Sequence, residues 1–232
     1  MAVPLIKRGD FLRLDRRALA LLRKASPHDL ILVTPSVDAE MMTHGYGIGI
    51  FAMPIPGNDA LPEVYAWYLP GRRGVIPLPP LAGTWLAQPP RSLRKSMRHF
   101  FISMNLDFAA VLQNCADIPR DGRWISPALE LAYLMLHGQG RAISVETRTP
   151  EGELVGGLFA VRSGDFICGE SMFHLRPDAS KAALVALAET AAAQGIRFID
   201  AQWSTDHLRR MGAIEVSWQA YLDALEGKPL SG

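Results

Sequence analysis

The chain has 232 residues, of which 49% are hydrophobic and 20% are charged, and its formal net charge is +1. This length suits one large domain or a domain with a smaller appendage, and it allows a core that needs no disulfide or structural metal. The nearly neutral charge excludes a protein whose whole surface binds nucleic acid, so any RNA contact must be a local patch.

The two cysteines, Cys115 and Cys168, lie far apart and match no metal-ligand spacing. We therefore expect neither a metal site nor a disulfide framework, and their scarcity is typical of a reducing compartment. The first ten residues contain no long apolar segment, and no apolar run approaches the ~20 residues of a membrane-spanning helix. These features predict a cytoplasmic protein without a membrane contact.

The N-terminal part predicts two helices. Apolar residues at helical spacing, with Arg and Lys between them, predict an amphipathic helix over 11–25. A second helix is predicted over 38–44, and Gly45 is expected to end it.

A loop-rich region follows over 54–90, where proline and glycine are frequent and short strand-like segments such as 64–69 occur. The pair Pro89-Pro90 marks the expected domain boundary. The sequence thus predicts a small, loop-rich N-terminal domain over 1–90 and a catalytic domain over 91–232.

The second domain has a regular pattern. Its predicted elements are, in chain order, a helix over 107–115 capped by Asp107, a helix over 126–137, strands over 142–147, 154–162 and 166–172, a long helix over 178–194 capped by its first residues, a strand over 196–201, a short helix over 205–211, a strand over 214–216 and a helix over 217–225. This order is typical of an α/β (α+β) domain with an acetyltransferase-like (GNAT) mixed sheet.

Three polar side chains stand near the ends of two apolar strands. A carboxylate at Glu170 is expected to be desolvated, which raises its pKa and makes it a candidate base or a partner for a cation. Asp200 and Gln202 are two residues apart, so we expect them on one face of their strand. If the two strands are neighbours, the three side chains converge at one edge of the sheet. Spacing alone favours a simpler role, in which they cap strand ends or bind nearby backbone.

Two other patterns suggest a nucleophile or a nucleotide-binding loop at first sight, but their details do not indicate such a site. Ser171 is central in the segment GESMF at 169–173, but the nucleophile elbow of serine hydrolases needs glycine where Phe173 stands. A serine hydrolase is therefore not expected. Gly156 and Gly157, inside a predicted strand, indicate a bulge or a close backbone approach rather than a nucleotide loop.

The densest basic segment covers 91–99. In a helix, Arg91, Arg94, Lys95 and Arg98 share one face, since they lie at positions i, i+3, i+4 and i+7. Such a face suits contacts with the phosphates of RNA. A solvated helix face without a ligand is an equally open interpretation.

Many short segments together resemble the leucyl/phenylalanyl-tRNA–protein transferases of bacteria, from about residue 41 to residue 221. The resembling segments are GIGIF at 47–51, the Trp67, Pro70 and Arg73 pattern, WI at 124–125, AY at 132–133, LH at 136–137, SVE at 144–146, LVGGL at 154–158, GESMF at 169–173, ASKAAL at 179–184, IDAQ at 199–202, HL at 207–208 and GA at 212–213. Their shared order and spacing make the resemblance specific.

The resemblance implies an enzyme with an acetyltransferase-like catalytic fold behind a small N-terminal domain. It implies that leucine or phenylalanine, with methionine as a further donor to test, moves from aminoacyl-tRNA to proteins that begin with Arg or Lys, which marks them for degradation. No cofactor is implied, and we expect a monomer. The turn over 176–181 also lacks the Q/R-x-x-G-x-G/A loop with which acetyltransferases hold coenzyme A.

On this reading, Gln202, oriented by Asp200, positions the attacking amine, while Glu170 holds a cationic group of the acceptor or of the donor. The residues expected to bind substrate are Trp67, Arg73, Trp124, Leu158, Met172, Phe173, Ser180 and Lys181. For the apolar residues among them, ordinary core packing is an equally open interpretation.

Departures from the family pattern stand at Ala52, Thr147 and Phe159, and they put the preferred donor in doubt more than the type of reaction. Two alternatives remain at this point. One is an acyltransferase of the same fold with another donor or acceptor, and the other is a non-catalytic RNA- or protein-binding derivative.

Overall fold

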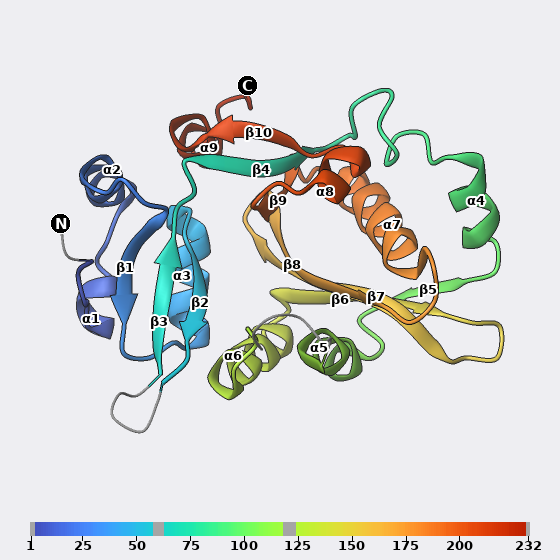
Figure 1. Cartoon of the computed structure of the whole chain (residues 1–232), viewed down its shortest axis with the longest axis horizontal. Coiled ribbons are helices and arrows are strands. Elements are labelled where there is room, and N and C mark those ends of the chain that lie inside the picture. The colour runs from blue at the N-terminus through green and yellow to red at the C-terminus, as the bar shows by residue number, and fades with distance from the viewer. Residues whose placement is uncertain (1–2, 58–62, 118–123, 231–232) are drawn as a thin grey trace. The chain divides into compact units, whose positions relative to one another are not determined.

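The computed structural model describes residues 3–57, 63–117 and 124–230, and Figure 1 shows the course of the chain. The chain folds as two compact units, each assembled from segments that are separate in the sequence. The first unit contains Met1–Arg73, Trp124–Met135 and Glu215–Gly232, and the second contains Gly74–Arg123 and Leu136–Ile214. The expected division after residue 90 stays a prediction.

The first unit is built on a three-stranded antiparallel sheet in the order β1-β3-β2. Its elements are α1 (Arg8–Phe11), α2 (Arg16–Ala25), β1 (Leu30–Thr34), α3 (Ala39–Ile48), β2 (Phe51–Ile55), β3 (Val64–Tyr68) and α9 (Trp218–Leu225). The aromatic and β-branched residues of β3 favour this central position, because both edges of the strand are paired and three of its five residues are buried.

The two helices predicted in this unit differ from the prediction in extent. The expected helix over 11–25 is divided into α1 and α2, because the Asp15 carboxylate accepts a hydrogen bond from the Ala18 N–H at 2.7 Å and so starts a new helix. The helix expected to end at Gly45 continues to Ile48. Gly45 lies inside α3, and only glycine fits at this position because a Cβ there would clash with the ring of Trp67.

A seven-stranded mixed sheet has the order β10-β4-β9-β8-β7-β6-β5. Its strands are β4 (Arg72–Pro77), β5 (Phe101–Met104), β6 (Ala142–Arg148), β7 (Leu154–Ser163), β8 (Phe166–His174), β9 (Phe198–Gln202) and β10 (Ile214–Ser217). The strands from β5 to β8 form an antiparallel meander, whereas β8 and β9 pair in parallel. Parallel neighbours need a crossover, which the helix between them supplies.

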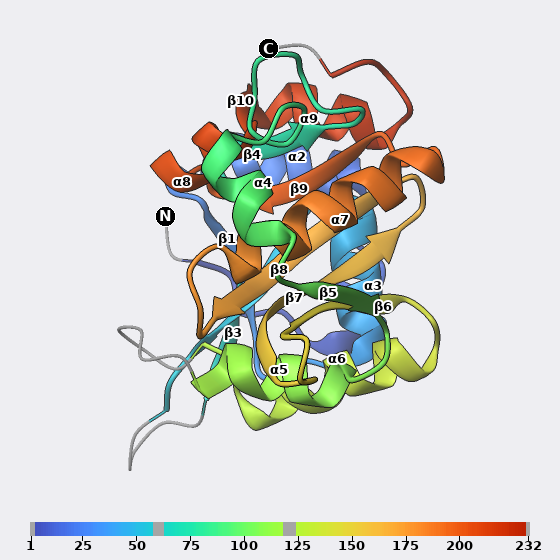
Figure 2. The ribbon, with the colours of Figure 1, turned by 90° about the vertical axis from the view of Figure 1, so that its right-hand side faces the viewer.

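The remaining helices are α4 (Arg91–Met97), α5 (Phe108–Asp117), α6 (Pro127–Gly138), α7 (Ala179–Ala193) and α8 (Asp206–Met211). Figures 1 and 2 show α7 on one face of the meander and α5 on the other. The predicted strands and helices of this region are confirmed, with ends shifted by a few residues. None of the described helices is long and apolar enough to cross a membrane.

Small residues allow α7 to lie close to β7. A Cβ added at Gly156 would stand 2.5 Å from the Cβ of Ala179, and one added at Gly157 would stand 2.7 Å from the carbonyl oxygen of Val145. The close backbone approach predicted for this glycine pair is therefore confirmed. It brings the N-terminus of α7 to the sheet and so fixes the position of the site described next.

Candidate active site

The candidate site lies where two neighbouring strands separate. β8 and β9 pair only from Phe166–Phe198 to Cys168–Asp200. On its other side, β8 shifts register against β7, since Phe159 pairs with Ser171 but the next residue pairs with Gly169. Glu170 is therefore an extra residue, a β-bulge, which bends a strand and increases its local twist. The ends of β8 and β9 diverge, and a cavity opens between them.

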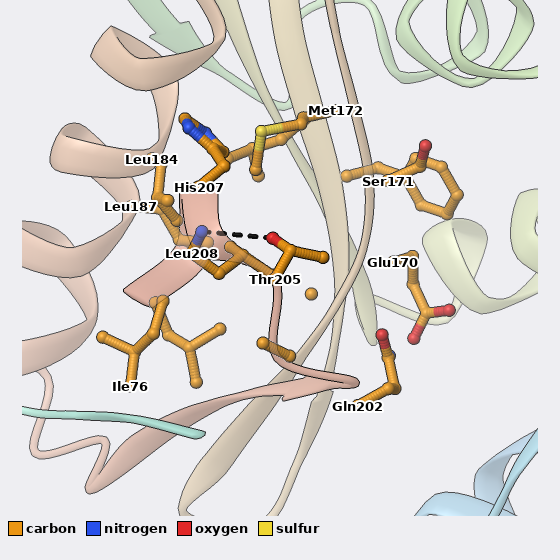
Figure 3. A pocket seen from close by; sticks show the side chains of 15 residues that line it. Ile76, Glu170, Ser171, Met172, Leu184, Leu187, Gln202, Thr205, His207 and Leu208 are labelled. Atoms are coloured by element: carbon orange, nitrogen blue, oxygen red, sulfur yellow. Dashed lines mark hydrogen bonds between the residues drawn. The ribbon is translucent and has the colours of Figure 1, made fainter. Parts of the chain in front are cut away.

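This cavity has a volume of about 260 Å³, and Figure 3 shows the side chains that line it. Its floor is apolar, and its lining residues of this kind include Ile76, Leu158, Phe159, Met172, Leu184, Leu187, Ile199, Ala201 and Leu208. Polar groups come from Glu170, Ser171, Gln202, Thr205 and His207. An apolar space with a few convergent polar groups is typical of a site for a small apolar ligand group.

Glu170 and Gln202 meet at this cavity, as the sequence predicted for two of the three polar residues. Both line it, and Figure 3 shows their side chains turned toward each other. They come from adjacent strands, two residues beyond the last backbone pair. The bulge in β8 and the end of β9 thus place a carboxylate and an amide close together at the edge of an apolar cavity.

The expectation that Asp200 and Gln202 share one face stays a prediction. Gln202 has a φ of 57°, which is left-handed backbone and interrupts the alternation of the strand. Ile199, Ala201 and Gln202 are among the residues that line the cavity, whereas Asp200 is not.

Asp200 instead supports the site from the interior. Its side chain is fully buried, and its Oδ1 accepts a hydrogen bond from the backbone N–H of Gln202 at 2.9 Å. The Cys168 thiol donates to Oδ2 over 3.8 Å. Asp200 thus binds the backbone of Gln202, and its orienting role in the reaction stays a prediction.

Thr205 and His207 are polar cavity residues that were not predicted for the site. The Thr205 hydroxyl accepts from the Leu208 N–H at 3.2 Å and so begins α8, as the dashed line in Figure 3 shows. Burial lowers the pKa of His207, and the positive charges of Lys181 and Arg210 lower it further, as does His174. The segment HL at 207–208 carried the signal for this residue, because it was one of the resembling segments.

The residues predicted to bind substrate fall into three places. Leu158 and Met172 line the cavity, whereas Phe173 is buried behind it against Gly157. Ser180 and Lys181 line a second cavity beside the first. For the buried Phe173, core packing is the role that its surroundings indicate.

The other three predicted binding residues belong to the first unit. Trp67 is 1% exposed, and its indole N–H donates to the Thr34 hydroxyl at 3.0 Å. The buried guanidinium of Arg73 lies 4.7 Å and 4.5 Å from the ring centres of Phe51 and Tyr221. These contacts organise the packing of the first unit.

Trp124 meets Tyr133 edge to face, with the ring centres 6.4 Å apart. Binding of substrate by Trp124, Trp67 and Arg73 stays a prediction.

The basic segment forms α4, as predicted. Arg91, Arg94, Lys95 and Arg98 are exposed, and none of them forms an ion pair with a residue that the structure describes. Four uncompensated cations on one short segment attract polyanions more strongly than paired charges do. A role in binding tRNA stays a prediction.

Comparisons with known proteins agree on one family. The family model described as leucyl/phenylalanyl-tRNA protein transferase matches residues 85–226. A leucyl/phenylalanyl-tRNA–protein transferase of Rhizorhabdus wittichii is 40% identical over 195 residues, which cover 82% of this chain and 75% of that protein. Another from Ruegeria pomeroyi is 42% identical over 193 residues, which cover 82% of this chain and 86% of that protein.

Among solved structures, a crystal structure of FemX matches with a TM-score of 0.50 at 12% identity, and the match covers 92% of this chain and 78% of that chain. At this identity the likeness concerns the fold alone. Together with the observed mixed sheet, it confirms the predicted α/β fold class.

Proposed function

Because the chain belongs to the leucyl/phenylalanyl-tRNA–protein transferase family, we propose that it joins leucine or phenylalanine carried by tRNA to the N-terminal residue of a protein. The acceptors begin with Arg or Lys, and the added residue marks them for degradation. The observation that carries the proposal is the apolar cavity with Glu170 and Gln202 at its polar side. Such a cavity suits an apolar side chain whose reactive end points toward the polar groups.

The donor's side chain occupies the apolar floor of the cavity, among residues such as Leu158, Leu187 and Ile199. Full burial of a leucine- or phenylalanine-sized group stabilises binding by ~1.5 to 3 kcal/mol. One methylene more or less changes this by only ~1 to 3 kcal/mol, so related apolar side chains are expected to react more slowly rather than not at all.

The reaction is an aminolysis of an ester. The acceptor's α-amino nitrogen attacks the carbonyl carbon of the aminoacyl ester, the bond to the ribose oxygen breaks, and that oxygen takes up the proton which the nitrogen loses. The ester is already activated, so the reaction consumes no ATP. An α-amino group has a pKa of about 7.7 to 8.0, so much of it must lose a proton near neutral pH before it can attack.

Gln202 supplies a hydrogen-bond partner that positions the amine, and Asp200 holds the backbone of Gln202 in place. Glu170 holds a cationic group, which is either the acceptor's charged end or the donor's α-ammonium. Orientation of the two reactants accounts for much of the rate, since effective concentrations in aligned pairs are very high. The strained backbone at Gln202 is consistent with a site that holds its groups in a fixed geometry.

The exposed cations of α4 contact phosphates of the tRNA, and the enzyme acts in the cytoplasm, where charged tRNA is present. It is expected to work as a monomer. Each phosphate contact makes binding weaker at higher salt, so the affinity for tRNA is expected to fall steeply as salt rises.

The direct test is transfer of labelled leucine from leucyl-tRNA to a peptide that begins with Arg, with an otherwise identical peptide that begins with Ala as control. We expect label on the first peptide only, and a reaction with phenylalanyl-tRNA as well. Methionyl-tRNA and an acyl-CoA donor are run in parallel. The proposal is wrong if only the acyl-CoA donor reacts, or if Glu170→Ala and Gln202→Ala both keep the wild-type rate.

A further inference from the structure

A second cavity adjoins the apolar one on the side of α7, and we refer to it as the α7 pocket. Its volume is about 710 Å³, and it is lined by Met172, His174, Leu175, Pro177, Asp178, Ser180, Lys181 and His207. Met172 and His207 line both cavities. One ligand can therefore occupy the two spaces at once.

The N-terminus of α7 opens into this pocket without a cap. Asp178 is at the capping position, but its side chain makes no capping hydrogen bond and its φ is 69°. The Ala179 N–H is bound by the Arg176 carbonyl at 3.2 Å. The N–H groups of Ser180 and Lys181 have no acceptor in the part of the chain that the structure describes. Such free N–H groups at the start of a 15-residue helix favour an anion.

A hydroxyl beside these N–H groups gives a second, independent sign of a ligand. Ser180 is only 6% exposed and lines the α7 pocket, and its hydroxyl has no hydrogen-bond partner among the described residues. The hydroxyl oxygen is not sealed in the interior, so it is open to the pocket and can donate to a ligand there. The hydroxyl and the free N–H groups of the helix offer several donors to one ligand.

The pocket lining combines a cation, an anion and two imidazoles. The Lys181 ammonium and the Asp178 carboxylate form an ion pair at 2.6 Å, and His174 and His207 supply the imidazoles. The Asp178 carboxylate is already engaged, since it accepts from Lys181 at 2.6 Å and from the Ser96 hydroxyl at 2.9 Å. These hydrogen bonds, chiefly the one from Lys181, lower the pKa of Asp178 and leave it a stable part of the pocket wall.

The same carboxylate links the pocket to the basic helix. Ser96 lies on α4, so its hydrogen bond to Asp178 joins α4 to the start of α7, and Figures 1 and 2 both show the two helices side by side. The four exposed cations of α4 thus continue toward the α7 pocket. A row of cations that ends in an anion pocket fits a chain of phosphates better than a single free phosphate ion.

We propose that the α7 pocket binds a phosphodiester group from the single-stranded 3′ end of the donor tRNA, while the aminoacyl side chain occupies the adjoining apolar cavity. The identity of the donor rests on the function proposed above. The phosphate accepts hydrogen bonds from the N–H groups and hydroxyl at the start of α7 and from Lys181. His207, which is neutral when the pocket is empty, gains a proton more readily once an anion lies beside it.

Binding is tested first, without reference to transfer. The ring signals of His174 and His207 are followed by NMR during titration with a CCA trinucleotide, with adenosine and with inorganic phosphate. We expect the trinucleotide to shift both signals at lower concentration than phosphate does, and adenosine to leave them nearly unchanged. No shift with the trinucleotide overturns the proposal. Equal affinity for inorganic phosphate overturns the assignment to tRNA and leaves a site for free phosphate.

Variants then link the pocket to its residues. Ser180→Ala and Lys181→Met are each expected to weaken trinucleotide binding by about tenfold, the range measured for one charge-assisted hydrogen bond. The matched control is Lys228→Met, because Lys228 has the same 2.6 Å contact with an aspartate, Asp223, but lies outside the pocket. Unchanged binding in both pocket variants, or an equal loss in the control, overturns the proposal.

Transfer separates this proposal from the function on which it rests. The donors are the leucyl ester of adenosine, which has no phosphate, and the leucyl ester of CCA. We expect the ratio of their kcat/KM values to favour the CCA ester and to fall about tenfold in Lys181→Met. If the wild type uses neither ester nor leucyl-tRNA, the function is wrong, and the NMR titration still decides the pocket. A ratio that Lys181→Met leaves unchanged contradicts the pocket alone.

Discussion

Replacement of Gln202 separates the stability of the site from its activity. Its φ of 57° is left-handed, a conformation that costs a residue with a Cβ ~1 to 2 kcal/mol and costs glycine almost nothing. Glycine also loses ~0.5 to 1 kcal/mol through its greater freedom in the unfolded chain. Gln202→Gly should therefore be about 0.5 to 1 kcal/mol more stable than Gln202→Ala. Both variants keep the backbone N–H that Asp200 binds.

The stability difference is measured by urea unfolding, and it should raise the melting temperature of the glycine variant by about 2 °C relative to the alanine variant. Ala201→Gly is the matched control, because its backbone is not left-handed and glycine should destabilise it by ~0.5 to 1 kcal/mol. Transfer of leucine should fall about a hundredfold in kcat/KM in both Gln202 variants, since both lose the amide that positions the amine.

Two results would refute this reasoning. Equal stability of the glycine and alanine variants would mean that the conformation at position 202 holds no strain. A wild-type kcat/KM in either variant would mean that the amide does not position the amine. Because the glycine and alanine variants are expected to differ in stability but to lose activity equally, a general loss of folding cannot produce the same pair of results.

Three further predictions concern other parts of the second unit. Gly156→Ala should destabilise the protein by ~1 to 3 kcal/mol in urea unfolding, because the new Cβ would stand 2.5 Å from that of Ala179, whereas Gly138→Ala, with open space around it, should change stability little. Met172→Ala should enlarge the cavity floor and raise the kcat/KM for phenylalanyl-tRNA relative to leucyl-tRNA by about tenfold, and an unchanged ratio would exclude this side chain from donor selection. Burial and nearby cations lower the pKa of His207 below its unfolded value of 6.5. As the pH drops below 6.5, the unfolded chain takes up a proton on this histidine before the folded protein does, so the free energy of unfolding falls. His207→Gln should therefore lose less stability between about pH 8 and pH 5 than the wild type does.

The elements of the second unit could be predicted from local signals. Asp107 and Thr205 each begin a helix by accepting a backbone N–H, and the expected helices follow them. Alternating and continuous apolar runs gave the strands of the meander, because a strand in a sheet that is covered on one or both faces must be apolar where it is covered. The order of these elements was sufficient for the fold class.

The prediction was weaker where packing overrides local preference. Gly45 was expected to end a helix, since glycine disfavours helix interiors, yet α3 continues to Ile48. Position 45 is glycine because the ring of Trp67 leaves no space for a side chain there. The N-terminal helix was expected to be continuous, although Asp15 starts a second one. A contact distant in sequence thus explains the glycine at position 45, and a single side-chain hydrogen bond decided where α2 begins.

The sequence by itself determined which chemistry is present: a carboxylate at Glu170, an amide at Gln202, and the family to which these motifs belong. Only the tertiary structure decided how they meet. The bulge at Glu170 and the left-handed backbone at Gln202 depend on strand register and on the buried carboxylate of Asp200, none of which is encoded in local periodicity. The α7 pocket likewise needs α4, β8, α7 and α8 to come together, because its donors belong to residues that no single motif contains. Spacing along a chain fixes the face of a residue only while the backbone stays regular, and functional sites are where it does not.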